Sequence, residues 1–474
     1  MSRATDDLAV AAPDPAEDLE DIALRDDYAL NPAFVEMVVD AADRGDTARL
    51  RELMDALHPA DVADLMGFLA ADYREELIPL IAPEDLGEII AELDGALREE
   101  VLDQVSPAVL AQAIGDMESD DAADVVDDLD LRKRGQVLAA MSDVDRASIE
   151  TSLAYEDETA GRLMQREVLA APQFWTVGQT IDHISGGGED IPELFFDVYV
   201  VDPFNRPLGA APVSHLLRNR REALLSEIME PVTEIPVDMD QEEVAYIFDK
   251  YHLISAPVVE AGGRLVGQIT VDDIVGVIQE ESQEDMLALA GVSDPGRGAT
   301  LFDVTRSRFW WLLINLGTAV LASGVIAIFQ GSIAKLAALA VLNPIAASMG
   351  GNAGTQTLTV AVRAMATKEL NAANILATVW REVAVGLMNG VAFAIIMGLV
   401  TVLWFHDPMM GVVIALAMVI NLFAAAVAGI LLPLALDKLG YDPAAASVVF
   451  LTTVTDCVGF FSFLGLATLL LLRH

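Results

Sequence analysis

Long apolar runs dominate the last third of the chain, whereas the first two thirds alternate apolar and polar positions at short intervals. Beyond residue 305 these runs are too long for the core of a water-soluble domain. A helix needs about 20 mostly apolar residues to cross the hydrocarbon layer of a membrane. The pattern therefore predicts five membrane-spanning helices, over residues 309–329, 336–364, 375–405, 410–436 and 444–472.

A shorter periodicity marks residues 28–160, where apolar stripes recur at helical spacing. Three stretches share an acid near a helix start, an apolar stripe and then an arginine: HPADVADLMGFLAADYREELIPLI, APEDLGEIIAELDGALREEVLDQV and ESDDAADVVDDLDLRKRGQVLAAM. A recurrence of about 20–25 residues predicts stacked helix pairs in a superhelical domain. Acids such as Asp61, Asp85 and Asp121 also suit helix starts for electrostatic reasons alone. Residues 1–27 are predicted to be a disordered acidic tail.

From residue 161 the pattern changes to alternating strands and helices. The stretch LFFDVYVVDPFNRPLGAAPVSHLL predicts strand, turn, strand and helix. The stretch IPVDMDQEEVAYIFDKYHLISAPVVEAGGRLVGQITVDDIVGVIQ predicts strand, capped helix, strand, Gly-Gly turn, strand and helix. We therefore expect two related α/β repeats, over residues 161–224 and 225–271. A connecting helix and linker over 272–305 would then lead into a transmembrane domain over 306–474.

Charge is divided as unevenly as hydrophobicity. The 474 residues include 73 acids and 28 bases, of which only six acids and eight bases lie at or beyond Arg306. The first 305 residues thus hold 67 acids and 20 bases, a net charge of −47, against +2 for the remainder. This division agrees with a first part in water and a second part in lipid. The single cysteine, Cys457, leaves no disulfide framework and no thiolate metal cluster.

The flanking charges predict how the chain is oriented. The N-terminal stretch is acidic and lacks the apolar core of a signal peptide, so we expect the large first part to stay in the cytosol. Basic residues near the span ends favour the same side, as the positive-inside rule requires. Six are predicted inside (Arg306, Arg308, Arg363, Lys368, Arg381, Lys438) and two outside (Lys335, Arg473). Five spans then predict a multi-pass protein of the cytoplasmic (inner) membrane with its C-terminus outside.

The segment PIAASMGGNAGTQ, residues 344–356, places polar residues inside the second predicted span. Pro344 removes one backbone amide and leaves the carbonyl of Ala340 without its helical partner. The glycines permit either close helix packing or backbone carbonyls that face a water-filled path. Their combination with side-chain oxygens favours the path. The candidate pore residues here are Gly351, Asn352, Gly354 and Gln356, with Gly350 and Thr355 beside them.

The last predicted span contains a carboxylate, Asp456, close to its middle. A charged aspartate there costs at least about 2.5–3.5 kcal/mol on insertion scales and marks a functional site by default. Thr452 and Thr453 precede Asp456 by one helical turn and Gly459 follows by one turn, so all share one face. No other span carries a base at comparable depth, which predicts a mobile cation as the counter-charge. The alternative is a protonated Asp456 hydrogen-bonded between helices.

The available ligands narrow the choice of cation. The spans offer carboxylate, hydroxyl, amide and carbonyl oxygens without a histidine or methionine cluster, which argues against copper and zinc. Mg²⁺ keeps most of its water and suits one or two carboxylates, whereas Ca²⁺ more naturally takes several. A twofold axis would place two copies of Asp456 across one pore. No HExxH, GxSxG or P-loop motif occurs, so an enzyme is not expected.

The segments SAPVV and GRLVGQITVDDI resemble a CBS domain. In nucleotide-binding CBS repeats the hydroxyl and the acid of this segment hold a ribose, which implies Thr270 and Asp273 here. The first repeat has Pro212 and His215 at the matching positions, so the resemblance implies at most one adenosine site of this type. Whether ATP binds is left open, because Asp273 could simply cap a helix.

The two membrane motifs, PIAASMGGNAGTQTLTVAVRA and YDPAAASVVFLTTVTDCVGFFSFLGLA, closely resemble the MgtE family of magnesium channels, as does the domain order over residues 28–474. The resemblance implies a cytosolic all-α superhelical domain, paired CBS repeats and a five-helix transmembrane domain. It also implies a homodimer whose second and fifth spans line a pore, with Asp456 binding hydrated Mg²⁺. The expected partners are Mg²⁺, the lipid bilayer and a second copy of the chain, not nucleic acid.

The same resemblance implies that cytosolic Mg²⁺ binds between acidic domains and closes the channel. The candidate regulatory residues are Asp120, Asp121, Asp124, Asp273, Glu281, Glu284 and Asp285. Gly276, Gln279 and His215 stand where relatives often carry acids, which predicts fewer or weaker regulatory ions. Two other functions remain: a secondary exchanger that moves divalent cations against Na⁺ or H⁺, and a Mg²⁺-sensing receptor without flux.

Overall fold

The computed structural model describes residues 19–93, 95–187, 191–192, 194–292, 301–370 and 374–472. These residues form two compact units that divide within one helix, between Ile278 and Gln279. The first unit holds the helical domain and both α/β repeats, and the second holds the membrane helices. Most of the predicted acidic tail lies outside the described residues. Residues 19–23, however, form helix α1, and Ala23 is buried, so the tail is shorter than residues 1–27.

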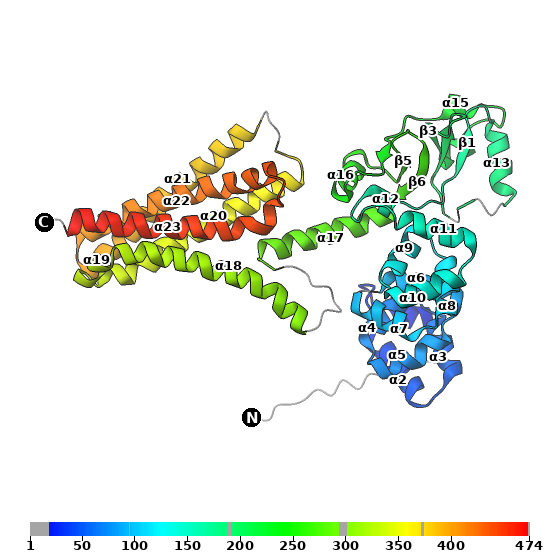
Figure 1. The fold of residues 1–474 in the computed structure, drawn as a ribbon, viewed down its shortest axis with the longest axis horizontal. Helices are drawn as coiled ribbons and strands as arrows, with labels where there is room; N and C mark the ends of the chain where they lie inside the picture. Colours follow the sequence, from blue (N-terminus) through cyan, green and yellow to red (C-terminus); the bar gives the residue numbers. More distant parts are fainter. Residues whose placement is uncertain are drawn as a thin grey trace. The chain divides into compact units, whose positions relative to one another are not determined.

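The helical domain consists of short helices joined by tight turns (Figure 1). They are α1 (Leu19–Ala23), α2 (Pro32–Asp43), α3 (Thr47–Met54), α4 (Pro59–Phe68), α5 (Ala71–Leu77), the 3₁₀ helix η1 (Ile78–Leu80), α6 (Pro83–Glu92), α7 (Gly95–Gln104), α8 (Pro107–Gly115), α9 (Ser119–Asp127), α10 (Leu131–Ala140) and α11 (Asp143–Ser152). The short helix α12 (Ala160–Leu163) packs instead on the second α/β repeat. Proline occupies the start of several of them, where its missing amide costs no hydrogen bond.

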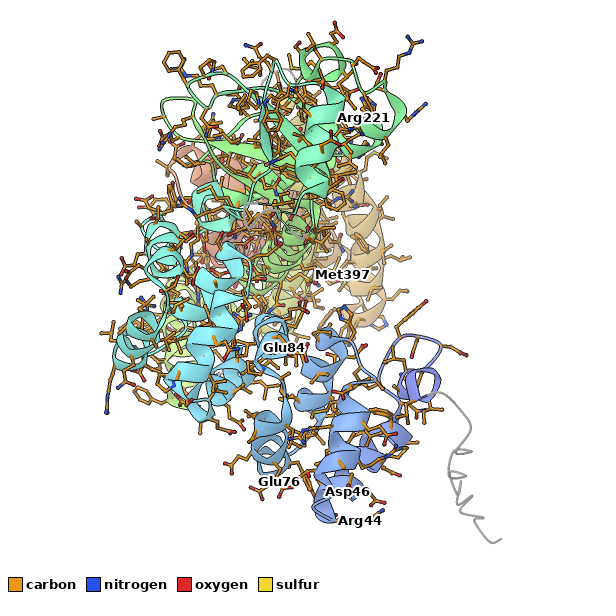
Figure 2. All side chains as sticks on the ribbon, turned by 90° about the vertical axis from the view of Figure 1, so that its right-hand side faces the viewer. Arg44, Asp46, Glu76, Glu84, Arg221 and Met397 are labelled. Atoms are coloured by element: carbon orange, nitrogen blue, oxygen red, sulfur yellow. The ribbon has the colours of Figure 1, made fainter. Side chains whose placement is uncertain are left out.

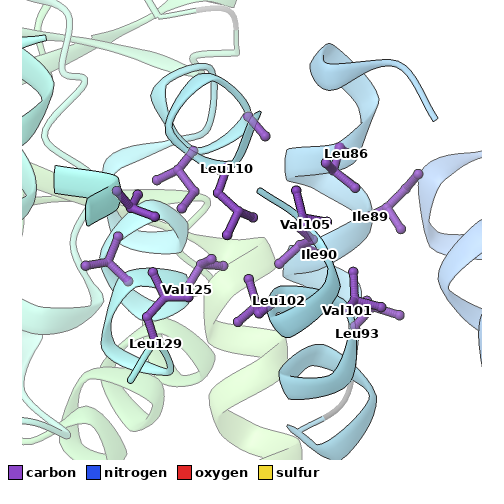
Figure 3. Close-up of a cluster of buried hydrophobic side chains, with 14 of the residues drawn as sticks. Leu86, Ile89, Ile90, Leu93, Val101, Leu102, Val105, Leu110, Val125 and Leu129 are labelled. Carbon is purple, nitrogen blue, oxygen red and sulfur yellow. The ribbon is translucent and has the colours of Figure 1, made fainter. Parts of the chain in front are cut away.

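The apolar stripes of these helices meet in one continuous core. Leu86, Ile90, Leu102, Leu110 and Val125 come from four successive helices and are almost completely buried (Figure 3). Charged side chains cover the outside, as Figure 2 shows with its labelled residues Arg44, Asp46, Glu76 and Glu84. The stacked helix pairs predicted from the sequence are therefore present.

The arginine that recurs in each repeat has a structural role. Arg74 donates to the carbonyls of Met66 and Leu69, at the end of α4. Arg98 donates to the carbonyls of Ala91 and Leu93 at the end of α6, and Arg134 caps α9 in the same way. Each guanidinium thereby satisfies carbonyls that a helix end leaves without partners.

The two α/β repeats have the same topology. Their elements are β1 (Ala170–Pro172), α13 (Val177–Ser185), β2 (Asp197–Val201), β3 (Pro207–Pro212), α14 (Val213–Arg218) and α15 (Leu225–Ile228), then β4 (Ile235–Pro236), α16 (Gln241–Tyr251), β5 (Ser255–Val259), β6 (Leu265–Thr270) and α17 (Val271–Leu289). In each sheet the first strand is parallel and the third antiparallel to the central one, with a register shift at the equivalent position. The predicted duplication is confirmed.

The second unit contains five long helices, as the apolar runs predict. Its elements are α18 (Leu301–Ile328), the short α19 (Gln330–Lys335), α20 (Ala338–Ala366), α21 (Ile375–Phe405), α22 (Pro408–Lys438) and α23 (Pro443–Leu471). Within the described residues, four candidate membrane spans satisfy both length and hydropathy, in α18, α21, α22 and α23. Helix α20 is equally long, but its polar segment lowers its hydropathy.

Helix α22 is the central member of this bundle and packs against α20, α21 and α23. Glycines allow a close approach: a β-carbon at Gly398 of α21 would lie 3.2 Å from the carbonyl oxygen of Gly411 in α22. Lipid tails are as apolar as leucine, so membrane helices associate largely through such close backbone packing. The long helices run side by side in Figure 1, which places α20 and α23 in direct contact.

Candidate ion-binding sites

The polar segment of α20 is helical throughout, although Pro344 lies inside it. The structure divides its residues between two faces. Gly350 and Gly354 are buried, whereas Asn352 and Gln356 are exposed in the single chain. A β-carbon at Gly354 would lie 2.8 Å from Cδ1 of Leu451 in α23, so this glycine permits close packing of two helices. The other face is the one that offers side-chain oxygens.

These oxygens form a row along α20. Asn352, Thr355, Gln356 and Thr359 are exposed and spaced by three or four residues, so they share one side of the helix. The hydroxyl of Thr355 donates to the carbonyl of Gly351 at 3.0 Å, so its oxygen can still accept a hydrogen bond. Amide side chains facing lipid tails would be very unfavourable. This face therefore requires water or another protein surface.

The carboxylate of Asp456 lies in α23, half-buried beside the fully buried Thr455. Among the described residues, no lysine, arginine or histidine nitrogen lies within 4.0 Å of it. The hydroxyls of Thr452 and Thr453 both donate to the carbonyl of Val449, at 3.1 and 2.7 Å. Asp456 thus lacks a fixed counter-charge, as the sequence predicts, and the nearby hydroxyl oxygens can still accept hydrogen bonds.

The predicted pore residues of α20 and α23 lie on packed neighbouring helices. A β-carbon at Gly351 would lie 4.0 Å from Oγ1 of Thr455, the residue next to Asp456. Gly459 is buried, and its β-carbon position lies 3.2 Å from the α-carbon of Ala347. The fold therefore brings the glycine-rich segment and the segment around Asp456 together, although Gly351 and Thr455 are 104 residues apart in sequence.

Sequence reasoning missed one polar residue at this contact. Asn421 of α22 is completely buried, and its Nδ2 donates to the carbonyl oxygen of Ala346 in α20 at 2.7 Å. Its position inside the apolar run MVINLFAAAV was a signal that could have found it. A polar residue in the membrane interior marks a functional candidate by default.

The acids predicted for regulation lie in two separate places, one in each unit. In the first unit, the starts of α9 and α17 bring Asp120, Asp121 and Asp273 close enough to influence one another's charge. Three acids that the sequence analysis did not select belong to the same cluster: Glu118, Glu167 and Asp272. Glu118 was detectable as the first acid of the ESDDAAD run. We call these six residues the junction cluster.

Burial and mutual repulsion raise the pKa values of this cluster. Desolvation, followed by the charges of Asp273 and Asp121, raises the pKa of Glu118 to about 7. Desolvation raises the pKa of Asp273 to about 7, against a hydrogen bond from the Thr270 hydroxyl at 2.8 Å that favours the charged form. Desolvation and the nearby Asp124 raise the pKa of Asp121 to about 6. The fold thus holds several carboxylates close together, and the positive charge near them does not compensate for their burial and mutual repulsion.

Asp120 is the most confined member of the junction cluster. It is 6 % exposed, and desolvation and then Asp273 raise its pKa strongly. Its Oδ1 atom is buried and has no hydrogen-bond partner in the described part of the chain. A buried acceptor without a partner is costly, so this oxygen suits a cation or its bound water. The neighbouring Ser119 is already satisfied, because its hydroxyl donates to Glu167 at 2.8 Å.

Asp124, also predicted as regulatory, has a basic partner. The nearly buried guanidinium of Arg162 lies 3.2 Å from Asp124 and 3.2 Å from Asp127. Desolvation raises the pKa of Asp124, whereas Arg162 and Arg98 lower it. The structure therefore places Asp124 in a fixed ion-pair network at the edge of the junction cluster.

In the second unit, the C-terminal part of α17 packs on the membrane helices. Ala288 and Leu289 contact the buried group that includes Leu358 of α20 and Leu451 of α23. Desolvation, followed by Asp442 and Glu281, raises the pKa of Asp285. Asp442 caps the start of α23 by accepting from the amide of Ala444 at 2.7 Å, and sequence analysis missed it. Glu284, also on α17, is exposed.

The candidate ribose residues have a local partner each. The hydroxyl of Thr270 donates to Asp273 Oδ2 across the start of α17, an arrangement that also stabilises the helix N-terminus. At the matching place in the first repeat, His215 Nδ1 lies 3.9 Å from Glu230 Oε1. The geometry thus agrees with the capping alternative and leaves nucleotide binding a prediction. Within the described residues, no three acidic, histidine or cysteine side chains converge closely enough to coordinate a metal ion directly.

Comparison with known proteins matches three segments of the chain to families. Residues 343–466 match the family described as MgtE, divalent cation transporter, residues 57–158 the MgtE intracellular N domain, and residues 225–280 the CBS domain. The chain is 32% identical over 326 residues to the magnesium transporter MgtE of Enterococcus faecalis, covering 69% of this chain and 72% of that protein. The chain belongs to the MgtE family.

Other MgtE proteins give the same result. The magnesium transporter MgtE of Thermus thermophilus is 32% identical over 332 residues, covering 69% of this chain and 73% of that protein. A crystal structure described as the cytosolic domain of the Mg²⁺ channel MgtE in complex with ATP is 30% identical, covers 51% of this chain and 99% of that one, and has a TM-score of 0.49. The family matches and the two curated relatives confirm the predicted family and fold class, and this MgtE protein is a multi-pass membrane protein.

Proposed function

We propose that this chain carries Mg²⁺ into the cell through a channel between α20 and α23 and that cytosolic Mg²⁺ closes it. The observation that supports this proposal best is the exposed polar row on α20 beside the unpaired carboxylate of Asp456. Neither feature is compatible with lipid, and both suit an aqueous cation path. The curated relatives described as magnesium transporters identify the ion.

Asp456 would hold Mg²⁺ through the ion's water shell. Mg²⁺ dehydrates reluctantly, so a single carboxylate with neighbouring neutral oxygens can bind it without stripping its water. Thr452 and the exposed amides of Asn352 and Gln356 supply such oxygens, while Gly351 leaves room beside them. Weak outer-shell binding also allows the ion to leave, which conduction requires.

The polar row favours a homodimer. In a single chain Asn352 and Gln356 are exposed, and a twofold axis beside α20 would turn both copies of this face toward one central path. Two copies of Asp456 would then double the negative charge along the path without additional residues. We place the acidic first unit in the cytosol and the protein in the cytoplasmic membrane, with the C-terminus outside, because the basic span ends fit that orientation.

The junction cluster would act as the sensor of internal Mg²⁺. Its acids repel one another, and among the described residues no donor reaches Oδ1 of Asp120. A divalent ion with its waters would neutralise this charge and stabilise the closed arrangement, whereas loss of the ion would shift the population toward an open one. Asp285 and Glu281 beside Asp442 form a second candidate site on the connecting helix.

ATP at the second CBS repeat is a further part of the proposal. Thr270 and Asp273 are the residues that would hold its ribose. Asp273 also belongs to the junction cluster. Nucleotide and Mg²⁺ would therefore compete for, or share, the same carboxylate.

Uptake by reconstituted protein tests the transport proposal. Purified chain in liposomes that contain a Mg²⁺-sensitive dye should take up Mg²⁺, and Asp456→Ala should lower the rate at least about tenfold because the path loses its charge. Asp407→Asn is the matched control, since this acid caps α22 at the edge of the bundle and asparagine can cap equally well. Full selective uptake by Asp456→Asn would contradict the site. Uptake that requires a Na⁺ or H⁺ gradient would instead identify an exchanger.

A further inference from the structure

Asn421 connects three helices of the membrane unit through one side chain. It lies in α22, and its Nδ2 reaches the carbonyl oxygen of Ala346 in α20, at 2.7 Å. The residue is 0 % exposed, and within the described residues its Oδ1 has no hydrogen-bond partner. A buried amide whose oxygen accepts no hydrogen bond disfavours folding. A purely structural contact at this position would be better served by an apolar residue.

Two glycines provide the space for this amide. A β-carbon at Gly350 of α20 would collide with Nδ2, Cγ and Oδ1 of Asn421. A β-carbon at Gly459 of α23 would lie 2.8 Å from Nδ2 and 3.3 Å from Cγ of the same residue. The asparagine therefore lies between two helices that approach each other where neither has a side chain. This arrangement gives a packing role to Gly459, a candidate pore residue, and to Gly350, which lies beside the candidate pore residues of α20.

Both glycines adjoin the proposed ion path. Gly350 precedes Gly351 and Asn352, and Gly459 follows Asp456 by one helical turn. We propose that Asn421 is a positioning residue that sets the separation of α20 and α23 and thereby holds the Asp456 carboxylate beside the polar row. This inference rests on the proposed channel function, because it assigns Asn421 to the geometry of that path.

A leucine at position 421 would have the same number of side-chain heavy atoms and the same branching, but bulkier methyl groups and a different contact. A carbon atom stays about 3.3–3.6 Å from a carbonyl oxygen, whereas Nδ2 lies 2.7 Å from Ala346 O. Replacing the amide should therefore move α20 outward by roughly 0.6–0.9 Å while removing the unsatisfied acceptor. The substitution therefore separates an effect on stability from an effect on geometry. It removes the unsatisfied acceptor that disfavours folding, but it changes the distance between α20 and α23.

The experiment compares Asn421→Leu and Asn421→Ala with the unaltered chain, all at full length. Helix spacing is measured by the rate of disulfide formation between Gly351→Cys and Thr455→Cys, with Cys457→Ser in every variant. These positions suit such a bond because the β-carbon site at Gly351 lies 4.0 Å from Oγ1 of Thr455. Thermal stability in detergent and Mg²⁺ uptake into liposomes, with Ca²⁺ uptake for comparison, are measured without the added cysteines.

For Asn421→Leu we expect a melting temperature equal to or above that of the unaltered chain. We also expect disulfide formation slowed by about fivefold and Mg²⁺ uptake reduced by about tenfold, with weaker discrimination against Ca²⁺. The single substitution Gly350→Ala should abolish uptake. Adding Asn421→Ala to the same chain should restore part of the uptake, because the three atoms nearest to the new β-carbon, Nδ2, Cγ and Oδ1 of Asn421, are then absent. Gly324→Ala, at a glycine with open space around it, is the control.

Unchanged uptake and selectivity in Asn421→Leu would overturn the proposal. So would a fall in uptake accompanied by an equal loss of stability and an unchanged disulfide rate, since that would show a merely structural residue. If the unaltered chain transports no Mg²⁺, the channel function fails and the assignment of Asn421 to the ion path fails with it. The disulfide rates would then still show whether Asn421 sets the helix spacing, so the two failures are distinguishable.

Discussion

If the junction cluster binds Mg²⁺ as proposed, the affinity of this site should depend on pH, and the size of the effect follows from the pKa values of its acids. Glu118 and Asp273 each have a pKa of about 7, because desolvation and neighbouring carboxylates disfavour their charged forms. A ligand that needs the carboxylate form must displace these protons. Each acid with a pKa of about 7 is roughly 9% ionised at about pH 6 and roughly 91% ionised at about pH 8.

If both acids contribute to one Mg²⁺ site, its affinity should rise about 100-fold over this range, tenfold for each acid. The same argument predicts release of about one proton per bound ion at about pH 7, falling to about 0.2 at about pH 8. Without divalent cations, the direction in which folding stability changes with pH also follows from these pKa values. Folding raises these pKa values, so the junction loses stability as pH rises from about 4 to about 7. For Asp273 the loss is on the order of 2–4 kcal/mol after allowance for solvent screening.

Titration calorimetry on the full-length protein in detergent measures both the Mg²⁺ affinity and the number of protons released per bound ion, when each pH is studied in two buffers of different ionisation enthalpy. Glu118→Gln should reduce the pH effect to about tenfold, because one titrating ligand remains. Glu84→Gln is the matched control. Glu84 occupies the same place in α6 that Asp120 occupies in α9, but it is exposed (Figure 2). An affinity that does not change with pH, or binding without proton release, would refute the assignment of these acids as ligands.

Three further outcomes follow from named contacts. Arg162→Met removes ion pairs to two aspartates of α9. In the presence of a chelator that removes divalent cations, the variant should lose about 1–3 kcal/mol of unfolding free energy, and amide hydrogen exchange in α9 should become faster. Unchanged exchange would show that the ion pairs contribute nothing to stability. Gly429→Ala should lower the melting temperature in detergent more than Gly354→Ala, because its β-carbon would meet backbone at 2.8 Å whereas that of Gly354 would meet the flexible end of a leucine; the reverse order would contradict this packing. Asp273→Ala should weaken ATP binding in equilibrium dialysis if this acid holds the ribose, and equal binding would leave it as a helix cap.

The sequence by itself determined the secondary structure and the division between water and lipid. Apolar runs of 20 or more residues can only be satisfied by helices in a membrane, so the five long helices were predictable. The duplicated α/β repeat was equally clear, because the alternation and turn signals occur twice. Asp456 could be selected because a carboxylate inside an apolar run is costly wherever the helix lies.

Only the tertiary structure decided which residues face one another. The glycine-rich segment could pack or line a path, and the fold assigns buried Gly350 and Gly354 to packing while Asn352 and Gln356 remain exposed. Acids are frequent throughout the first unit, and their spacing does not reveal which become buried. Asp120 and Asp273 are 153 residues apart in sequence and interact because folding brings the starts of α9 and α17 together. Desolvation and charge coupling depend on such long-range proximity, which local sequence patterns do not encode.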